Sequence, residues 1–432
     1  MIAANLVLIG LFVLLLIVGA PIAVALGLAG VAAVWVGLDP AVVAMVGTTV
    51  YASIAKYPLI AIPLFILTGM IFERSGVAAK LVTLAQAIVG PRRGGLALVA
   101  VLVCLIMGGM SGSGPADAAA VATIMLPSMV KAGYPRPLSA TVIAAGASTA
   151  ILIPPSIALI IYSVVVPGVD LRALFAGGII PGLLAGLSIM LPALWLSRRY
   201  DFGAAEGETR PPLWPSLRAA VPGLLAPVII LGGLRSGLFT PTEAAVVAVA
   251  YGFVVGTLVY RNMGWRECYN VLADSAQTSA VIMIIISLAG LFAWAGSTLG
   301  AFSAAAQVIM AFSDSGLLVL LMVMLLLLLA GMVLDGVSIY LITLPLLIPI
   351  ATAFDWNLTW FGVLMAMNIA IGQFTPPVAV NLMVTSRIAQ VPIESTVVWA
   401  LWMVFSMSMA LGLLIMFPQL ALWLPQVLGY RV

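Results

Sequence analysis

Two proline pairs lie inside long apolar segments of the sequence, Pro154-Pro155 and Pro376-Pro377. A proline inside a helix has no backbone N–H, so the carbonyl four residues earlier loses its partner. The carbonyls freed in this way are those of Ala150, Ile151, Gly372 and Gln373. In lipid no water replaces the lost partner, and a bound Na⁺ can do so because hard cations prefer oxygen ligands.

Each proline pair also predicts a break between two half-helices, at residues 151–156 and 373–378. The second half-helix would point its partly positive N-terminus at the break, which suits a carboxylate. The alternative is that each pair only kinks a helix. Both pairs lie at the same distance from a Gly-Met pair, which favours a built site over two coincidental kinks.

Two joints rich in helix-breaking residues are the second candidate feature. The first joint is 111–115, and it connects two short apolar arms at 95–110 and 115–131. The second joint is 334–336, and it connects arms at 316–333 and 337–353. Because Gly, Ser, Pro and Asp break helices, each set predicts a helical hairpin. The hairpin is re-entrant if its joint lies at mid-depth in the membrane.

The polar residues at these joints could bind ions or substrate. Asp117 and Asp335 lie beside the joints, where a carboxylate is costly unless it has a function. The alternative to a functional role for these acids is that they cap the hairpin helices, so neither is assigned as a proton carrier. The alternative to ligand binding by Ser111 and Ser113 is close packing of helices through small residues. With no Lys or Arg at the joints or breaks, an anion would be held by helix N-termini, hydroxyl groups and coupled cations. The candidate substrate-binding residues are Ser111, Ser113, Ser156, Ser338 and Asn381.

The composition indicates that these elements are positioned in a bilayer. Of 432 residues, 64% are hydrophobic and 7% are charged, whereas soluble domains carry about 25% charged residues. Long runs without Asp, Glu, Lys or Arg cover 137–169, 173–197, 275–313, 315–334, 356–386 and 395–430. Each reaches the roughly 20 residues that a helical crossing needs. We therefore predict an all-α polytopic membrane protein. The predicted spans are 4–19, 21–38, 57–72, 95–110, 115–131, 137–167, 173–197, 219–234, 241–260, 277–297, 316–333, 337–353, 358–388 and 396–424.

Several classes of function are disfavoured because the sequence has no histidine and only two cysteines. Histidine metal sites, histidine proton relays and a disulfide framework are therefore excluded. An embedded enzyme would need a nucleophile with a base or a cluster of metal ligands, so we expect neither an enzyme nor a cofactor. The first apolar stretch lacks a basic n-region and is expected to be a span and not a signal peptide. A net charge of +3 says little about partners, and no nucleic-acid partner is expected.

The chain shows an internal repeat at an offset of 222 residues. The offset aligns Gly109-Met110 with Gly331-Met332, Gly114 with Gly336, and the first proline pair with the second. Repeats that contain broken helices are typical of secondary transporters, with the site at the interface between the repeats. On that interpretation the predicted repeats are 1–167 (scaffold helices 1–56, transport part 57–167 with hairpin 95–131) and 219–388 (scaffold helices 219–276, transport part 277–388 with hairpin 316–353). Residues 168–218 are predicted as a connecting helix and cytoplasmic loop, and 389–432 as a C-terminal helix. Within the scaffold helices, the mixed segments 40–56 and 262–276 are predicted to be interfacial amphipathic helices.

The distribution of basic residues predicts the orientation. The base of the first hairpin carries Arg92, Arg93, Lys131 and Arg136, whereas the base of the second carries Asp314 and Asp355. The first base is therefore predicted to be cytoplasmic and the second periplasmic, with both hairpins re-entrant. Five crossings then separate the starts of the repeats, which makes them inverted. The basic exceptions outside are Arg172, Arg235 and Arg431.

The motifs closely resemble those of the large membrane subunit (DctM-like) of TRAP transporters, the tripartite ATP-independent periplasmic family. They are GMSGSGPADAAAVATIMLP (109–127), IPPSIALIIY (153–162), GLFTPTEAAVVAVAYG (237–252), LDGVSIYLITLPLLIP (334–349) and FTPPVAVNL (374–382). The resemblance covers nearly the whole chain. It implies an elevator-type fold of the ion transporter superfamily, in a bacterial inner membrane.

The resemblance also implies ion sites and partners. One sodium site would use Ser111, Gly114, Ala150, Ile153 and Pro155, and the other Val333, Gly336, Gly372, Thr375 and Val378, mostly through backbone carbonyls. Sodium is the only metal expected. The implied partners are a small membrane subunit (DctQ-like) and a periplasmic binding protein (DctP-like) that delivers an organic acid such as a C4-dicarboxylate or sialic acid. The alternative is a stand-alone sodium-coupled symporter or antiporter of the same superfamily.

Overall fold

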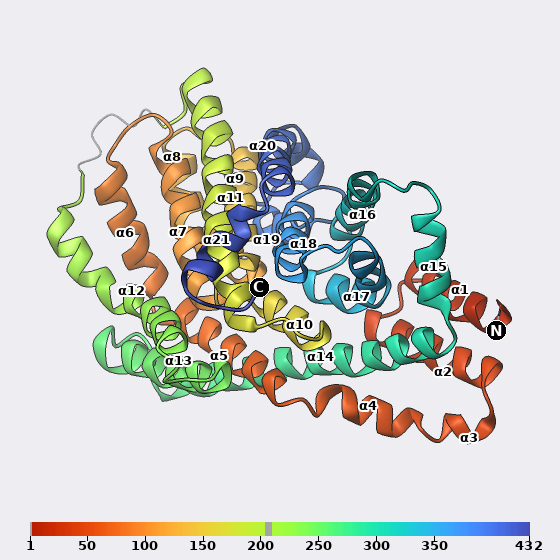
Figure 1. Ribbon diagram of the computed structural model, residues 1–432. Coiled ribbons are helices and arrows are strands. Elements are labelled where there is room, and N and C mark those ends of the chain that lie inside the picture. Colours follow the sequence, from red (N-terminus) through yellow and green to blue (C-terminus); the bar gives the residue numbers. More distant parts are fainter. Residues whose placement is uncertain (1, 204–209) are drawn as a thin grey trace.

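The structure is a computed structural model that describes residues 2–203 and 210–432, and within them every regular element is helical (Figure 1). The first half contains α1 (Ile2–Ile17), α2 (Ile22–Gly37), α3 (Pro40–Val43), α4 (Val46–Ile54), η1 (Tyr57–Ile60), α5 (Ala61–Arg74), α6 (Val77–Val89), α7 (Gly95–Ser111), α8 (Gly114–Lys131), α9 (Arg136–Ser148), η2 (Thr149–Ile151), α10 (Ile157–Val165) and α11 (Leu171–Arg199). The second half contains α12 (Leu213–Arg235), α13 (Pro241–Val254), η3 (Val255–Val259), α14 (Trp265–Thr298), α15 (Ala301–Met310), α16 (Gly316–Gly331), α17 (Gly336–Ala353), α18 (Leu358–Gly372), α19 (Val380–Ala389), η4 (Ile393–Thr396), α20 (Val397–Met416) and α21 (Gln419–Val427). Residues 204–209 of the predicted loop lie outside the described residues.

Seven helices in the described part of the chain are long and apolar enough to cross a bilayer. The longest, α14 and α11, have 34 and 29 residues, against the roughly 20 that a crossing needs. On α11, Leu183, Leu187 and Leu191 recur every four residues, and each side chain is more than half exposed. Because such an apolar stripe is stable against lipid, the chain is a multi-pass membrane protein.

Both predicted hairpins and both predicted breaks are present. Helices α7 and α8 pack together across Gly112 and Ser113, and α16 and α17 pack together across residues 332–335. The predicted span 137–167 is divided into α9, η2 and α10, and the span 358–388 into α18 and α19. In each case the proline pair falls in the gap, as expected from the missing backbone donors.

Three features of the helix pattern were predicted wrongly. Helices α6 and α15 have 13 and 10 residues and were missed, because both are shorter than the roughly 20 apolar residues that predict a span. The segments 262–276 and 277–297 are not separate, since α14 continues through both without a proline. The predicted C-terminal span 396–424 is two helices, α20 and α21, because Pro418 follows the end of α20.

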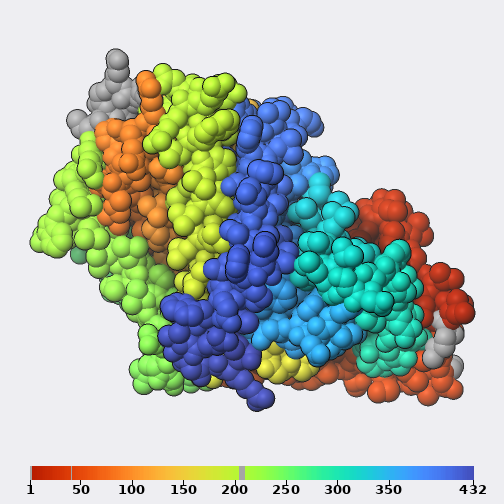
Figure 2. Space-filling model, turned by 45° about the horizontal axis from the view of Figure 1, so that its top comes forward, coloured from red at the N-terminus to blue at the C-terminus, as the bar shows by residue number. Residues whose placement is uncertain are grey.

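The half-helices before the two breaks form the centre of the protein. Residues 138–148 of α9 and 359–372 of α18 are all buried. Small residues allow this close packing: a Cβ on Gly146 of α9 would lie 3.2 Å from the Cα of Val101 in α7. On the surface, α20 and α21 lie against α11 (Figure 2). The breaks are therefore positioned by two fully buried half-helices.

Helix α14 extends beneath these elements, from α13 to α15 (Figure 1). It packs against α2, α4, α5 and α17. Near its start, Glu267 and Asp274 accept hydrogen bonds from Arg74 at the end of α5, at 3.0 and 2.5 Å. One helix thus contacts elements of both predicted repeats.

Candidate functional site

The first break is closed by Ser156. Helix α9 passes into one 3-10 turn at Thr149–Ile151, and α10 begins at Ile157. The hydroxyl of Ser156 donates to the carbonyl of Ile151 and accepts from the backbone N–H of Leu159, at 3.3 Å. Ser156 is therefore the N-cap of α10, and its hydroxyl is largely committed to holding the break.

The second break is closed by backbone groups. The N–H of Asn381 donates to the carbonyl of Gln373 at 3.0 Å, and the N–H of Thr375 donates to that of Gly372 at 3.1 Å. The hydroxyl of Thr375 donates to the carbonyl of Ile371 at 2.6 Å. Three of the four carbonyls predicted to be freed, those of Ile151, Gly372 and Gln373, therefore have a partner within the protein. Each oxygen has two lone pairs, so one remains for an ion.

Glycines bring the hairpin tips onto the breaks. Gly112, with φ +59°, ends α7, and a Cβ there would lie 2.3 Å from the carbonyl oxygen of Pro155. A Cβ on Gly108 would lie 2.8 Å from the Cα of Ala150. In the second half, the carbonyl of Met332 at the tip accepts from the N–H of Ala379 at 3.0 Å. Both tips thus contact the break of their own repeat.

Residues of the two tips, the two breaks and α14 line one cavity of about 180 Å³. It is smaller than the roughly 300–1000 Å³ of sites for drug-sized ligands, so it suits a small one. The lining residues are Gly112, Ser113, Gly114, Pro115, Ile151, Ile157, Ala158, Ile282, Asp335, Gly336, Val337 and Gln373. Among these described lining residues there is no Lys or Arg.

The two acids at the joints differ in their surroundings. Asp335 is the N-cap of α17 and accepts from the N–H groups of Val337 and Ser338, at 3.0 and 3.2 Å, and from the hydroxyl of Ser338. Its capping role, left open by the sequence, is thus established. Asp117 is wholly buried in α8, and its carboxylate has no hydrogen-bond partner among the described residues. Only Asp335 lines the cavity.

Asn381 joins the two repeats. Its side-chain amide donates to the carbonyl of Ala144 in α9 at 3.4 Å, although it belongs to α19. Its amide atoms lie 2.8 and 3.0 Å from the position that a Cβ on Gly114 would take. The side chain is fully buried, and its carbonyl oxygen has no partner among the described residues. Asn381 therefore packs behind the first tip and does not line the cavity.

The structure brings part of the predicted site together. Ser113, Gly114, Ile151 and Gly336 line the cavity, whereas the hydroxyl of Ser111 is buried and accepts from the N–H of Ser113 at 3.1 Å. Away from the cavity lining, the side chains of Val333 and Val378 are exposed. Sequence reasoning missed the side chain of Gln373 and missed Ile282 of α14. Gln373 was detectable as a polar residue beside a proline pair, but nothing in the sequence marked Ile282.

Comparisons with known proteins agree on one family. The model described as "Tripartite ATP-independent periplasmic transporter, DctM component" matches residues 9–420. The C4-dicarboxylate TRAP transporter large permease protein DctM of Pseudomonas aeruginosa is 38% identical over 404 residues, which are 94% of each chain. The 2,3-diketo-L-gulonate TRAP transporter large permease protein YiaN of Escherichia coli is 37% identical over 88% of this chain and 89% of its own length.

Two further comparisons bear on extent and fold. The isethionate TRAP transporter permease protein DctMQ of Oleidesulfovibrio alaskensis is 36% identical over 90% of this chain, and the match spans 61% of that protein. The solved YdaH transporter of Alcanivorax borkumensis matches 97% of this chain and 99% of its own with a TM-score of 0.65, at 15% identity. That likeness shows a shared fold.

Proposed function

The chain belongs to the DctM component family of TRAP transporters, and we propose that it is the large membrane subunit of a sodium-coupled importer of an organic acid. The relatives are transporter permeases, not enzymes. The observation that carries the proposal is the meeting of two hairpin tips and two broken helices around one cavity. Broken helices around a shared site are typical of secondary transporters.

Sodium coupling is supported by the charge balance of the cavity. Its described lining contains one acid, Asp335, and no basic residue. An organic anion would need positive charge there, which Na⁺ bound to backbone carbonyls would supply. Two sodium sites are proposed. One consists of Ser111, Gly114, Ala150, Ile153 and Pro155, and the other of Val333, Gly336, Gly372, Thr375 and Val378. Since each ligand favours the other, sodium and substrate would increase each other's affinity by the same factor.

The proposed substrate is a small carboxylate. The relatives are named for a C4-dicarboxylate, 2,3-diketo-L-gulonate, sialic acid and isethionate, which are all organic anions. Candidate contacts are the hydroxyl of Ser113 and the N-termini of the helices that begin at the tips. Ser156 and Ser338 would contribute only by exchanging their present hydrogen bonds.

The proposed mechanism is an elevator in a bacterial inner membrane. The transport parts, predicted as 57–167 and 277–388, would carry the loaded site across while the scaffold helices stay fixed. Because α14 is continuous from Trp265 to Thr298, the boundary between the moving and fixed parts of the second repeat would lie at an end of α14 and not at residue 277. A small membrane subunit would brace the scaffold, and a periplasmic binding protein would deliver the substrate. The names of relatives, such as DctMQ, support an assembly of more than one unit.

Reconstitution in liposomes tests this proposal. The chain would be reconstituted with and without a small membrane subunit and a binding protein, and uptake of succinate and sialic acid driven by a sodium gradient would be measured. We expect uptake only with the complete set. Full sodium-dependent uptake by the chain alone would make it a stand-alone symporter, and equal uptake driven by protons without sodium would refute sodium coupling.

A further inference from the structure

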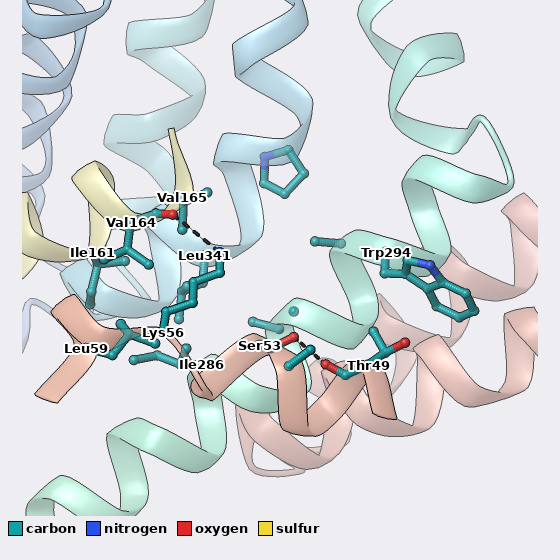
Figure 3. A pocket seen from close by; sticks show the side chains of 15 residues that line it. Thr49, Ser53, Lys56, Leu59, Ile161, Val164, Val165, Ile286, Trp294 and Leu341 are labelled. Carbon is teal, nitrogen blue, oxygen red and sulfur yellow. Dashed lines mark hydrogen bonds between the residues drawn. The ribbon is translucent and has the colours of Figure 1, made fainter. Parts of the chain in front are cut away.

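A second, larger cavity has a volume of about 420 Å³ (Figure 3). Its walls come from α4, α10, α14 and α17, and most of the lining is apolar. Neither the proline pairs nor the joints contribute to it, so the site described above does not account for it.

The linings of the two cavities are offset by a single helical turn. The smaller cavity is lined by Ile157 of α10, Ile282 of α14 and Val337 of α17. The larger is lined by Ile161, Ile286 and Leu341, which follow them by four residues on the same three helices. One turn rises about 5.4 Å, so the two cavities lie at successive levels of the space between α10, α14 and α17, here called the slot.

Lys56 supplies the one positive charge to this slot among its described lining residues. It follows α4 and is exposed, and its side chain extends toward α10 (Figure 3). Its ammonium group donates to the carbonyl of Val164 at 3.4 Å. That distance is well beyond the roughly 2.9 Å of an ordinary N–H···O bond, so a carboxylate could displace the carbonyl.

The position of Lys56 also opposes the trend of the other basic residues. The span that begins at residue 57 leads, through α6, to the base of the first hairpin, which is predicted to be cytoplasmic. With 13 residues, α6 is too short to add a crossing. Lys56 is therefore also placed on the periplasmic side, where lysine is disfavoured near short loops, and it adds a fourth exception to Arg172, Arg235 and Arg431. A basic residue on the periplasmic side, in a cavity next to a proposed anion site, is therefore a candidate for binding the anion.

We propose that the larger cavity is the periplasmic vestibule of the substrate path and that Lys56 captures the carboxylate of the incoming acid there. The inference rests on the proposed transport function. The anion would bind the ammonium group first, because a lone cation in a low-dielectric cleft concentrates anions. It would then move one helical turn inward, where sodium ions and helix N-termini replace the lysine.

The competing explanation is structural. Lys56 contacts a carbonyl in the last turn of α10, where a lysine stabilises a helix C-terminus. In that case its loss would lower stability or the maximal rate and leave the concentration dependence of uptake unchanged.

The test compares Lys56→Gln, Lys56→Arg and the control Arg172→Gln in the complete complex. Arg172 is also predicted to be periplasmic, but it is paired with Asp170 at 3.0 Å and lines a different cavity. Initial uptake would be measured for succinate, or for sialic acid if the wild type does not take up succinate. We expect Lys56→Gln to raise KM about tenfold, equivalent to about 1.4 kcal/mol, with Vmax within about twofold, because capture precedes translocation. Lys56→Arg should restore most of the affinity, and Arg172→Gln should match the wild type.

Ionic strength and binding-protein affinity complete the test. The KM difference between the wild type and Lys56→Gln should shrink as salt is raised, since salt screens exposed charges. The affinity of the loaded binding protein for the complex should not change. An unchanged KM in Lys56→Gln, or a loss explained by weaker docking of the binding protein, would overturn the inference while leaving transport intact. If the wild-type complex takes up neither acid in a sodium-dependent manner, the proposed function is refuted, and the inference about Lys56 is refuted with it.

Discussion

Gly372 at the end of α18 packs against Gly331 at the end of α16, and a Cβ on Gly372 would lie 2.5 Å from the Cα of Gly331. The contact joins the second hairpin to the second broken helix at the level of the cavity. In the first repeat, Gly108 and Ala150 make a similar contact. Close backbone approach is thus how each tip is held against its break.

Gly372→Ala is expected to destabilise the protein by about 1–3 kcal/mol, because the added methyl group meets backbone that cannot move aside. The measurement is thermal unfolding of the purified protein in detergent, followed by tryptophan fluorescence. Gly412→Ala is the matched control. A Cβ at Gly412, which lies in α20 four residues before its end at Met416, meets nothing within 4 Å. That variant should therefore gain up to about 1 kcal/mol from helix propensity. Equal melting temperatures of Gly372→Ala and Gly412→Ala would contradict the close contact between Gly372 and Gly331.

Thr375→Ala should weaken the sodium dependence of uptake more than it lowers stability. The hydroxyl already donates to Ile371 at 2.6 Å and keeps its lone pairs for a cation. We expect the sodium concentration for half-maximal uptake to rise about fivefold, equivalent to about 1 kcal/mol. Thr375→Ser keeps the hydroxyl and should stay near the wild type. An unchanged sodium dependence in Thr375→Ala would remove this residue from the proposed site.

Asp335→Ala should cost about 1 kcal/mol, because α17 loses its N-cap. Asp335→Asn keeps a side-chain oxygen for the N–H groups of Val337 and Ser338 and should retain most of the stability. Thermal unfolding measures the change in stability of the whole protein. Hydrogen exchange of the first backbone amides of α17 shows whether the change is located at the start of that helix. If Asn and Ala behave alike, the negative charge of Asp335 matters more than its capping bonds.

The predicted topology is tested by labelling single cysteines with a membrane-impermeant thiol reagent in right-side-out cells. Lys131 and Asp314 are both exposed, at the bases of the first and second hairpins. In a background with Cys268→Ser, a cysteine at position 314 should react from outside and one at 131 should not. Cys104 is buried and should stay silent. Labelling at 131 from the periplasm would exclude the inverted arrangement.

Local chemistry explains why much of this protein could be predicted from its sequence. The membrane class follows from composition, because only a bilayer suits a chain with 7% charged residues. The hairpins and breaks follow from groups of Gly, Ser and Pro close together, whereas single prolines such as Pro181 and Pro192 lie inside α11 without ending it. The sequence pattern missed α6 and α15 because short amphipathic helices depend on the partners they pack against.

The site itself was decided by contacts between distant parts of the chain. Asn381 contacts a carbonyl 237 residues away, and Lys56 contacts one 108 residues away. Ile282 reaches the cavity only because α14 runs on from Trp265 to Thr298 beneath both halves. The sequence by itself determined which residues break the helices and leave polar groups in an apolar setting. Tertiary structure decided which of them meet, since packing between segments far apart in the chain depends on the shape of all the helices together.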